Sequence, residues 1–456
     1  MATDLIAAAA TAWGRSAVGI VRLSGPGAAD CAGEVFSPAG GGSLRSRAPR
    51  KLVYGTLRDR EGREVDKVLA TWSPQGGSYT GEETAELQCH GSPMALTLCL
   101  EALFAHGARQ ALPGEFTRRA FLNGRLDLLQ AEAVMDLIDA ETPAAARMAA
   151  GQLSGGLSRR AEEVYQGLVD VMAHFHAVLD YPDEDLDPFT ADTVASALAK
   201  AQEALTALLA TYDRGRVLKN GVPCAIVGLP NAGKSSLLNA LVGYDRAIVT
   251  EIPGTTRDTV EEKCVLGGVL LRLIDTAGVR ETGDAVEQLG VERSRAAMEE
   301  AGLILVVIDR TTGLSGAALS LAQEAMSLAP TLVLYNKCDL PPFDGPHPLI
   351  ALPGELEISA KTGAGLDALA QAVSDLFPQG GEAESGELLT NARQAEAVKR
   401  ALDGTSRALS ALKAGVTPDA LLTDVEEALS ALGELTGKTV REDVTARIFE
   451  RFCVGK

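Results

Sequence analysis

The sequence predicts a multidomain protein of mixed α/β and α structure. Its 456 residues are enough for two or three domains, each with a core of its own. In the middle of the chain, short apolar strands alternate with helical segments, which is typical of a doubly wound parallel sheet. Ala- and Leu-rich helical stretches lie on both sides of this part. We therefore expect the doubly wound domain to be inserted between two parts of a helical domain.

Four segments follow from this pattern. The first combines short β-like runs at 18–23 and 85–88 with a helical stretch at 93–106, which indicates a compact α/β domain. A Gly- and Glu-rich stretch at 379–386 has the composition of a linker. We expect an α/β domain at 1–118, the first part of a helical domain at 119–216, the doubly wound domain at 217–378 and the second helical part at 379–456.

Composition restricts the location and the partners of the protein. The net charge is −19, so the surface as a whole does not favour nucleic-acid phosphates, and contact with RNA would need a local patch or a basic partner. The seven cysteines are scattered and show no Cys-x-x-Cys spacing, which fits a reducing cytoplasm. The first residues lack the positive charges of a signal peptide, and no apolar run is long enough to span a membrane. We expect a cytoplasmic protein without a membrane partner.

Residues 228–235 have the pattern Gly-x-x-x-x-Gly-Lys-Ser, which binds nucleotide phosphates. The pattern follows an apolar strand at 224–227 and opens a helix at 235–241. Gly228 and Gly233 allow backbone N–H groups to turn towards phosphates. Lys234 supplies positive charge, and the hydroxyl of Ser235 is suited to Mg²⁺.

Two further segments complete the phosphate and magnesium chemistry. Thr256, within a loop at 254–258, is placed to bind Mg²⁺ and to sense the γ-phosphate. Asp275 follows an apolar strand at 270–274 and is the expected carboxylate near the metal, and the N–H of Gly278 is suited to the γ-phosphate.

The base is identified by residues 336–339, Asn-Lys-Cys-Asp, which follow the strand at 331–335. The carboxylate of Asp339 would accept hydrogen bonds from N1–H and the 2-amino group of guanine, whereas adenine offers an acceptor there. The segment 359–361, Ser-Ala-Lys, supplies a backbone contact to guanine O6. The sequence therefore predicts GTP and a Ras-like P-loop GTPase domain. The expected GTP contacts are Asn231, Ala232, Gly233, Lys234, Ser235, Ser236, Thr250, Thr255, Thr256, Asp275, Thr276, Ala277, Gly278, Asn336, Lys337, Asp339, Ser359, Ala360 and Lys361.

Hydrolysis must use an arrangement different from that of many small GTPases. Those proteins carry Gln directly after Asp-x-x-Gly to orient the attacking water, and here the position is Val279. Asn231 is a candidate for holding a monovalent cation beside the phosphates, where its charge would replace that of an arginine finger. Glu287 is a candidate for orienting water, and the alternative is a solvated carboxylate on a surface helix.

The chain ends Phe-Cys-Val-Gly-Lys, with Cys453 in the tail. The ending does not fit a prenylation signal, because Gly455 is not aliphatic, Lys456 is not a usual last residue and no polybasic stretch precedes them. Cys453 is then either a buried structural residue or a reactive thiol on a tail that reaches a pocket.

Taken together, these segments resemble the tRNA-modification GTPase family MnmE, also called TrmE, over the full length of the chain. The resemblance rests on the GTP motifs, on Gly-Arg-x-x-Val-Gly-Ile-x-Arg at 14–22 and on Tyr-Thr-Gly-Glu-Glu at 79–83. It rests equally on Pro-Gly-Glu-Phe-Thr at 113–117, Arg-Ala-Phe-Leu-Asn-Gly-Arg-Leu-Asp-Leu at 119–128 and the ending Phe-Cys-x-Gly-Lys.

The resemblance implies a homodimer formed through the N-terminal domain, which binds a 5-formyl- or methylene-tetrahydrofolate. By residue-for-residue transfer, the folate site consists of Arg22, Glu86, Arg125 and Lys456. Position 125 is Lys in some relatives, and a guanidinium equally suits a folate carboxylate or polar edge. The resemblance also implies a flavin- and NADH-dependent partner, MnmG (GidA). The two proteins together add an aminomethyl or carboxymethylaminomethyl group to C5 of the wobble uridine, position 34, of certain tRNAs.

The resemblance assigns roles within the GTP domain as well. It implies K⁺ bound by Asn231, Thr250, Ile252 and Thr255, and K⁺-promoted pairing of two GTP domains. Mg²⁺ would be held by Ser235 and Thr256, and the catalytic residues would be Glu287, Lys234 and Cys453. The expected function is GTP hydrolysis coupled to tRNA modification.

Two other functions remain open at this stage. A ribosome-assembly or other regulatory GTPase would bind RNA without modifying it, but the acidic composition and the absence of a recognisable RNA-binding module disfavour this reading. Alternatively, the outer domains serve only as a dimerisation scaffold. Absence of folate binding by residues 1–118 would favour this scaffold over the modification function.

Overall fold

The structure is a computed structural model that describes residues 4–180, 191–244, 262–274, 295–344, 352, 354–378, 385–415, 418–439, 442–450 and 452–456. The chain divides into two compact units. The first consists of Met1–Met135, Ala161–Ala197 and Asp403–Lys456, and the second consists of Asp136–Arg160 and Leu198–Leu402. The division falls inside four helices: α4 (Leu128–Ile138), α6 (Gly156–Asp180), α7 (Ala191–Leu209) and α15 (Ala392–Lys413).

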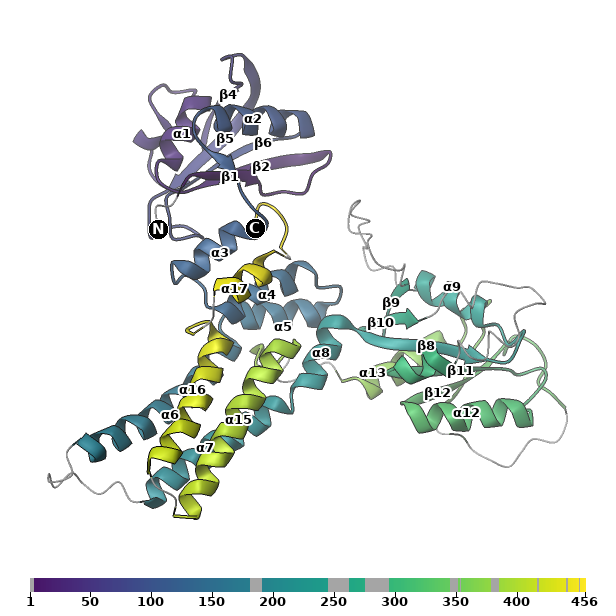
Figure 1. The fold of residues 1–456 in the computed structure, drawn as a ribbon. Helices are drawn as coiled ribbons and strands as arrows, with labels where there is room; N and C mark the ends of the chain where they lie inside the picture. The colour runs from purple at the N-terminus through teal and green to yellow at the C-terminus, as the bar shows by residue number, and fades with distance from the viewer. Residues whose placement is uncertain are drawn as a thin grey trace. The chain divides into compact units, whose positions relative to one another are not determined.

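A seven-stranded sheet with the order β3-β4-β5-β6-β2-β1-β7 forms the N-terminal part of the first unit (Figure 1). Neighbouring strands run antiparallel, except that β1 and β7 are parallel. A short 3₁₀ turn at Leu44–Ser46 lies between β3 and β4. The strands are β1 (Ile6–Ala9), β2 (Ser16–Ser24), β3 (Phe36–Pro38), β4 (Val53–Arg58), β5 (Glu64–Ser73), β6 (Thr84–Gly91) and β7 (Arg109–Gln110).

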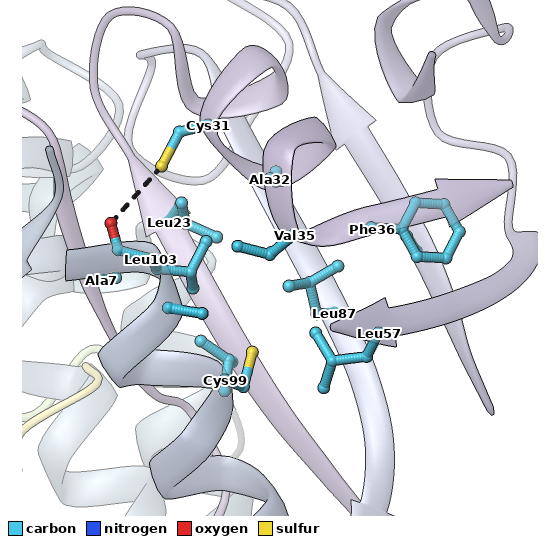
Figure 2. Packing of buried hydrophobic residues seen from close by; sticks show 14 of the residues in the cluster. Ala7, Leu23, Cys31, Ala32, Val35, Phe36, Leu57, Leu87, Cys99 and Leu103 are labelled. Carbon is cyan, nitrogen blue, oxygen red and sulfur yellow. Dashed lines mark hydrogen bonds between the residues drawn. The ribbon is translucent and has the colours of Figure 1, made fainter. Parts of the chain in front are cut away.

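Two helices, α1 (Ala28–Val35) and α2 (Pro93–Ala105), cover one face of this sheet. Figure 2 shows how strand residues such as Leu23, Leu57 and Leu87 meet helix residues such as Val35 and Leu103. Successive residues of a strand point to opposite faces, so only alternate positions enter this core.

Cys31 belongs to the same core. Its Sγ lies 3.8 Å from the carbonyl oxygen of Leu103, and burial raises the pKa of this thiol to about 11. A buried thiol of this kind is inert. The seven cysteines are all free, and only the side chain of Cys453 is exposed.

The remainder of the first unit is helical. It contains α3 (Glu115–Leu122), α16 (Pro418–Thr436), α17 (Glu442–Phe449) and parts of α4, α6, α7 and α15. Gly404 of α15 lies so close to α16 that an added Cβ would come within 2.8 Å of the carbonyl oxygen of Asp424. Lys438 Nζ, just after α16, lies 2.7 Å from a carboxylate oxygen of Glu162 and 4.2 Å from the ring centre of Tyr165, both on α6.

The second unit contains a six-stranded sheet with the order β13-β12-β11-β8-β10-β9. Every neighbouring pair is parallel except β9 and β10. The chain passes from β8 to one side of the sheet and later returns to the other, so a topological switch point lies at the carboxyl end of β8. The strands are β8 (Val222–Gly228), β9 (Glu262–Leu266), β10 (Val269–Ile274), β11 (Leu303–Asp309), β12 (Thr331–Asn336) and β13 (Glu355–Glu357).

Helices cover both faces of this sheet, as the doubly wound class requires. Leu237, Leu238 and Leu241 of α9 (Lys234–Tyr244) pack on one face together with residues of α13 (Leu366–Leu376). Ala318, Ala322 and Ala325 of α12 (Gly316–Leu328) pack on the opposite face. Neighbouring residues of β11, Leu305 and Val306, accordingly belong to different cores.

Two short helices of the second unit, α5 (Pro143–Leu153) and α8 (Tyr212–Asn220), pack together through Ala144, Met148 and Leu218. Thr142 caps α5 by accepting a hydrogen bond from the backbone N–H of Ala145. Among the residues that the structure describes, no helix is long and apolar enough to cross a membrane.

Candidate functional site

The phosphate loop lies at the switch point, between the end of β8 and the start of α9. Gly233 has φ +96°, a left-handed conformation that favours glycine, and a Cβ added there would come within 2.2 Å of Asn336 Nδ2. The ammonium group of Lys234 donates to the carbonyl oxygens of Gly228 (2.9 Å) and Leu229 (3.1 Å). Burial lowers the pKa of Lys234, so its charge favours an anionic partner such as phosphate.

Asn336 ties the phosphate loop to the segment at 359–361. Its Nδ2 donates to the carbonyl oxygen of Ala232 at 2.9 Å, and its Oδ1 accepts from the backbone N–H of Ala360 at 3.0 Å. Asn336 is 2% exposed, so both bonds are shielded from competing water. The buried amide therefore fixes the spacing between the two loops.

Lys337, in the guanine loop at 336–339, makes a second connection to the phosphate loop. Its Nζ donates to the carbonyl oxygen of Asn231 at 2.9 Å and to Asp309 Oδ2 at 2.6 Å. Asn231 and Lys337 both have left-handed backbones, with φ +63° and +68°. Burial opposes ionisation of Asp309, but hydrogen bonds from Lys337 and Thr311 outweigh it and hold the pKa of this carboxyl below its usual value.

Asp339 is oriented by a buried neighbour. Ser359, which is fully buried, donates from Oγ to Asp339 Oδ1 at 2.7 Å. This hydrogen bond lowers the pKa of Asp339, so the carboxylate stays ionised. An ionised, oriented carboxylate is the acceptor that the N1–H and 2-amino edge of guanine requires.

The structure brings together the two groups of segments that carry the predicted nucleotide residues within the described part of the chain. The phosphate loop and α9 carry Asn231, Ala232, Gly233, Lys234, Ser235 and Ser236. The segments across from them carry Asn336, Lys337, Asp339, Ser359, Ala360 and Lys361. Ser235 lies in the first turn of α9, and the side chain of Ser236 is exposed. The remaining predicted residues lie outside the described residues: Thr250, Ile252, Thr255, Thr256, Asp275, Thr276, Ala277, Gly278 and Glu287.

A second set of predicted residues lies in the first unit. Arg22 on β2 and Glu86 on β6 are cross-strand neighbours, and Arg22 Nε donates to Glu86 Oε1 at 2.8 Å. The guanidinium of Arg22 lies 6.0 Å from the ring centre of Tyr79 and 5.9 Å from that of Phe116. A charge pair beside two aromatic rings is suited to a ligand that has both a flat polar ring and charged groups.

The C-terminal tail packs beside the same residues. The backbone N–H of Phe116 donates to the carbonyl oxygen of Lys456 at 3.1 Å, and Pro113 and Val454 form a β-bridge. Gly455 has φ +98°, and an added Cβ would come within 2.0 Å of the carbonyl oxygen of Ala9. These contacts hold Lys456 beside the N-terminal sheet and leave the side chain of Cys453 exposed.

Arg125 lies beside the loop that carries Tyr79. A Cβ added to Gly81 would come within 3.2 Å of the Arg125 side chain. Asn123 holds the same loop, because its Nδ2 donates to the carbonyl oxygen of Thr80 at 2.8 Å. The four residues predicted for the folate site are far apart in the sequence, but all of them lie near Tyr79 or Phe116. They are Arg22, Glu86, Arg125 and Lys456.

Sequence reasoning missed two groups of residues at these sites. Asp309 was not predicted, although an acidic residue that directly follows a buried strand is a usable signal at the carboxyl edge of a parallel sheet. The buried ion network of Arg119 with Glu82 and Glu115 was not predicted either, although the three segments that contain these residues all carry the family resemblance. Among the described residues, no cluster of three or more His, Cys, Asp or Glu side chains is arranged to hold a metal.

A doubly wound sheet with a phosphate loop bonded to a guanine-selective loop defines the class of this protein as a P-loop GTP-binding protein. A family model described as the MnmE helical domain matches residues 128–453, and one described as the GTP-binding protein TrmE N-terminus matches residues 5–125. The chain belongs to the tRNA modification GTPase family MnmE, and it is a GTP hydrolase of that family.

Curated relatives named tRNA modification GTPase MnmE are similar over their full length. The relative from Akkermansia muciniphila is 44% identical, and the match covers 99% of this chain and 98% of the relative. The relative from Alkaliphilus metalliredigens is 42% identical, with 99% of each chain covered. The relative from Chloroflexus aurantiacus is 44% identical over 99% of this chain and all of the relative.

Proposed function

We propose that this protein couples GTP hydrolysis to modification of the wobble uridine of certain tRNAs at C5, as a homodimer acting with a flavin-dependent partner of the MnmG type. The observation that carries the proposal is the Arg22–Glu86 pair, which adjoins the rings of Tyr79 and Phe116 and the C-terminal tail. A GTP-driven switch without modification activity has no need for such a second site.

A tetrahydrofolate fits the chemistry of this second site. The pterin ring presents the same amino-pyrimidine edge as guanine, so a carboxylate such as that of Glu86 is a suitable acceptor. Guanidinium and ammonium groups, as on Arg22, Arg125 and Lys456, suit the carboxylates of the folate tail. When bound, the folate would supply a one-carbon unit to the uridine. We propose residues 1–118 as the folate-binding and dimerisation domain, 119–216 and 379–456 as the helical domain, and 217–378 as the GTPase domain.

Potassium fits the phosphate loop at Asn231. The side chain of Asn231 is exposed, and no hydrogen bond to it is present among the described residues, so its amide oxygen is available for a cation. Thr250, Ile252 and Thr255 are the further proposed ligands. For Mg²⁺ we propose Ser235, in the first turn of α9, together with Thr256.

The proposed catalytic roles divide between charge and orientation. Lys234 stabilises the negative charge that develops on the phosphates, and Glu287 orients the attacking water. We further propose that pairing of the two GTPase domains, and its reversal after hydrolysis, reorganises the modification site of the dimer. Cys453 is the proposed reactive residue of that site, and its side chain is exposed.

The test is nucleoside mass spectrometry of bulk tRNA from a strain that lacks this protein. Complementation with the wild type is expected to restore C5-aminomethyl-type wobble uridines, whereas Cys453→Ser is not. Cys338→Ser is the matched control, since it occupies the unspecified position of Asn-Lys-x-Asp and its side chain is half-buried. If deletion leaves these nucleosides unchanged, the modification function is wrong, and a regulatory GTPase without modification activity becomes the better explanation.

A further inference from the structure

The contact between Lys337 and Asn231 connects the guanine-binding motif at 336–339 to the phosphate loop. Lys337 belongs to the guanine motif, yet its ammonium group donates to the backbone carbonyl of Asn231 in the phosphate loop. Asn231 is the residue to which the proposed function assigns the monovalent cation. The position of the Lys337 ammonium therefore affects the backbone of Asn231, a proposed cation ligand.

The backbone of Asn231 needs such support. The left-handed region is less favourable than ordinary backbone for residues other than glycine, although asparagine adopts it more readily than most, and Asn231 has φ +63°. Its side chain is exposed and has no hydrogen bond among the described residues, so the side chain does not stabilise this conformation. The hydrogen bond from Lys337 to the backbone carbonyl of Asn231 stabilises it.

Asp309 determines where the Lys337 ammonium lies. Its Oδ2 accepts from Lys337 Nζ at 2.6 Å, while Oδ1 accepts from the N–H of Thr311 at 2.9 Å and from its hydroxyl at 2.7 Å. The Asp309 side chain is 12% exposed, so the charge pair is largely shielded from solvent. Both oxygens are held, and the carboxylate therefore fixes the lysine in one position.

We propose that Asp309 is a positioning residue for the monovalent cation. Through Lys337 it holds Asn231 in the left-handed conformation that presents its amide to the cation. This inference rests on the proposed potassium function of Asn231. It adds that the cation affinity of the phosphate loop depends on a carboxylate at the end of β11 that acts through Lys337.

The test compares Asp309→Asn with two other variants. Asp309→Asn keeps the shape of the side chain and removes its charge. Lys337→Met breaks the same connection from the other side, and is used if Asp309→Asn does not fold. Ser359→Ala is the matched control, because it removes the hydrogen bond to Asp339 and leaves the contacts between Asp309, Lys337 and Asn231 intact.

The first measurement needs neither potassium nor turnover. Amide hydrogen exchange of residues 231–233 is followed in nucleotide-free protein in sodium buffer. Exchange is expected to be ~10-fold faster in Asp309→Asn than in the wild type, because one well-placed charged hydrogen bond corresponds to about a factor of ten. Ser359→Ala is expected to exchange as the wild type does.

The second measurement is the potassium concentration that half-activates GTP hydrolysis at saturating GTP. It is expected to rise by ~10-fold in Asp309→Asn and to stay unchanged in Ser359→Ala, whose KM for GTP rises instead. Unchanged exchange and an unchanged potassium midpoint in a folded Asp309→Asn or Lys337→Met variant would overturn the inference. Failure of the underlying potassium function is distinguishable, because the wild type itself would then show no difference between potassium and sodium.

Discussion

Asn336 and Ala232 are joined by a hydrogen bond of 2.9 Å from the side-chain amide to the backbone carbonyl, across more than a hundred residues of sequence. The other end of the same amide accepts from Ala360. A donor and an acceptor are both required, and Asn supplies them in a fixed geometry within a buried site. These two hydrogen bonds therefore hold the phosphate loop and the segment at 359–361 at one separation.

Asn336→Asp is expected to lower the affinity for GDP by ~100-fold. It replaces the donor with an oxygen that faces the carbonyl of Ala232, and burying this unpaired acceptor costs about 3 kcal/mol. Titration with a fluorescent GDP analogue measures the effect. Asn239→Asp, an exposed change of the same kind on α9, is the control and is expected to bind GDP normally. Equal affinities for the two variants would show that the connection between the loops does not support binding.

Asp339→Asn is expected to change the preferred base from guanine to xanthine. The new amide donates where the carboxylate accepted, and xanthine has a carbonyl oxygen in place of the guanine 2-amino group. GTP hydrolysis at low substrate should fall by ~100-fold, and XTP should become the better substrate. Competition between the two nucleotides measures the preference. A variant that still prefers GTP would contradict the assignment of Asp339 to the base.

The GTP site was predictable because its chemistry requires particular residue types at fixed spacing. Glycine at 233 is required where the backbone is left-handed and an amide lies against it, and Asp339 is required by the guanine edge. The strands expected at 18–23, 85–88, 270–274 and 331–335 are confirmed as β2, β6, β10 and β12. Three of them are mostly apolar runs, and 85–88 alternates apolar and polar residues.

What was not predictable depends on contacts between distant segments. No local pattern indicates that Asp309 meets Lys337, or that Glu82 meets Arg119, because these pairs form only when separate elements pack. The arrangement of Arg22 with Glu86 follows from strand register, and register cannot be deduced from the two strands alone. The resemblance to a family supplied these residues as a set, but not their geometry.

Gly455→Ala is expected to weaken folate binding by ~10-fold or more without unfolding the protein. The added Cβ would overlap the carbonyl oxygen of Ala9, so the tail that carries Lys456 must move. Gly107→Ala is the matched control, because its φ of +96° is nearly the same as the +98° of Gly455 but its Cβ would meet nothing within 4 Å. Calorimetric titration with 5-formyltetrahydrofolate measures both variants. A similar loss in both would attribute the effect to backbone strain rather than to displacement of the tail.

Arg119→Met is expected to destabilise the N-terminal domain by ~3–5 kcal/mol, since it removes the buried cation that pairs with Glu82 and one of the two cations that pair with Glu115. Arg119 lies 3.0 Å from Glu82 Oε2 and 2.9 Å from Glu115 Oε1, and all three side chains are 9% exposed. Arg60→Met removes an exposed pair with Glu61 and is the control, with little expected change in stability because solvent screens an exposed pair. Both tryptophans, Trp13 and Trp72, lie in this domain, so urea unfolding followed by their fluorescence reports on it.

Acid should destabilise the same ion network. Burial opposes ionisation of Glu115, but hydrogen bonds from Arg109, Leu112 and Arg119 outweigh it, so the pKa of Glu115 is lowered. A carboxyl with a lowered folded-state pKa stabilises the fold above its unfolded value, near 4.5, and this stabilisation is lost as the pH falls through the lower folded value. The free energy of unfolding of the wild type should therefore fall steeply below pH 4.5, and that of Arg119→Met less steeply. Parallel pH profiles for the two proteins would contradict a role of Arg119 in holding the pKa of Glu115 down.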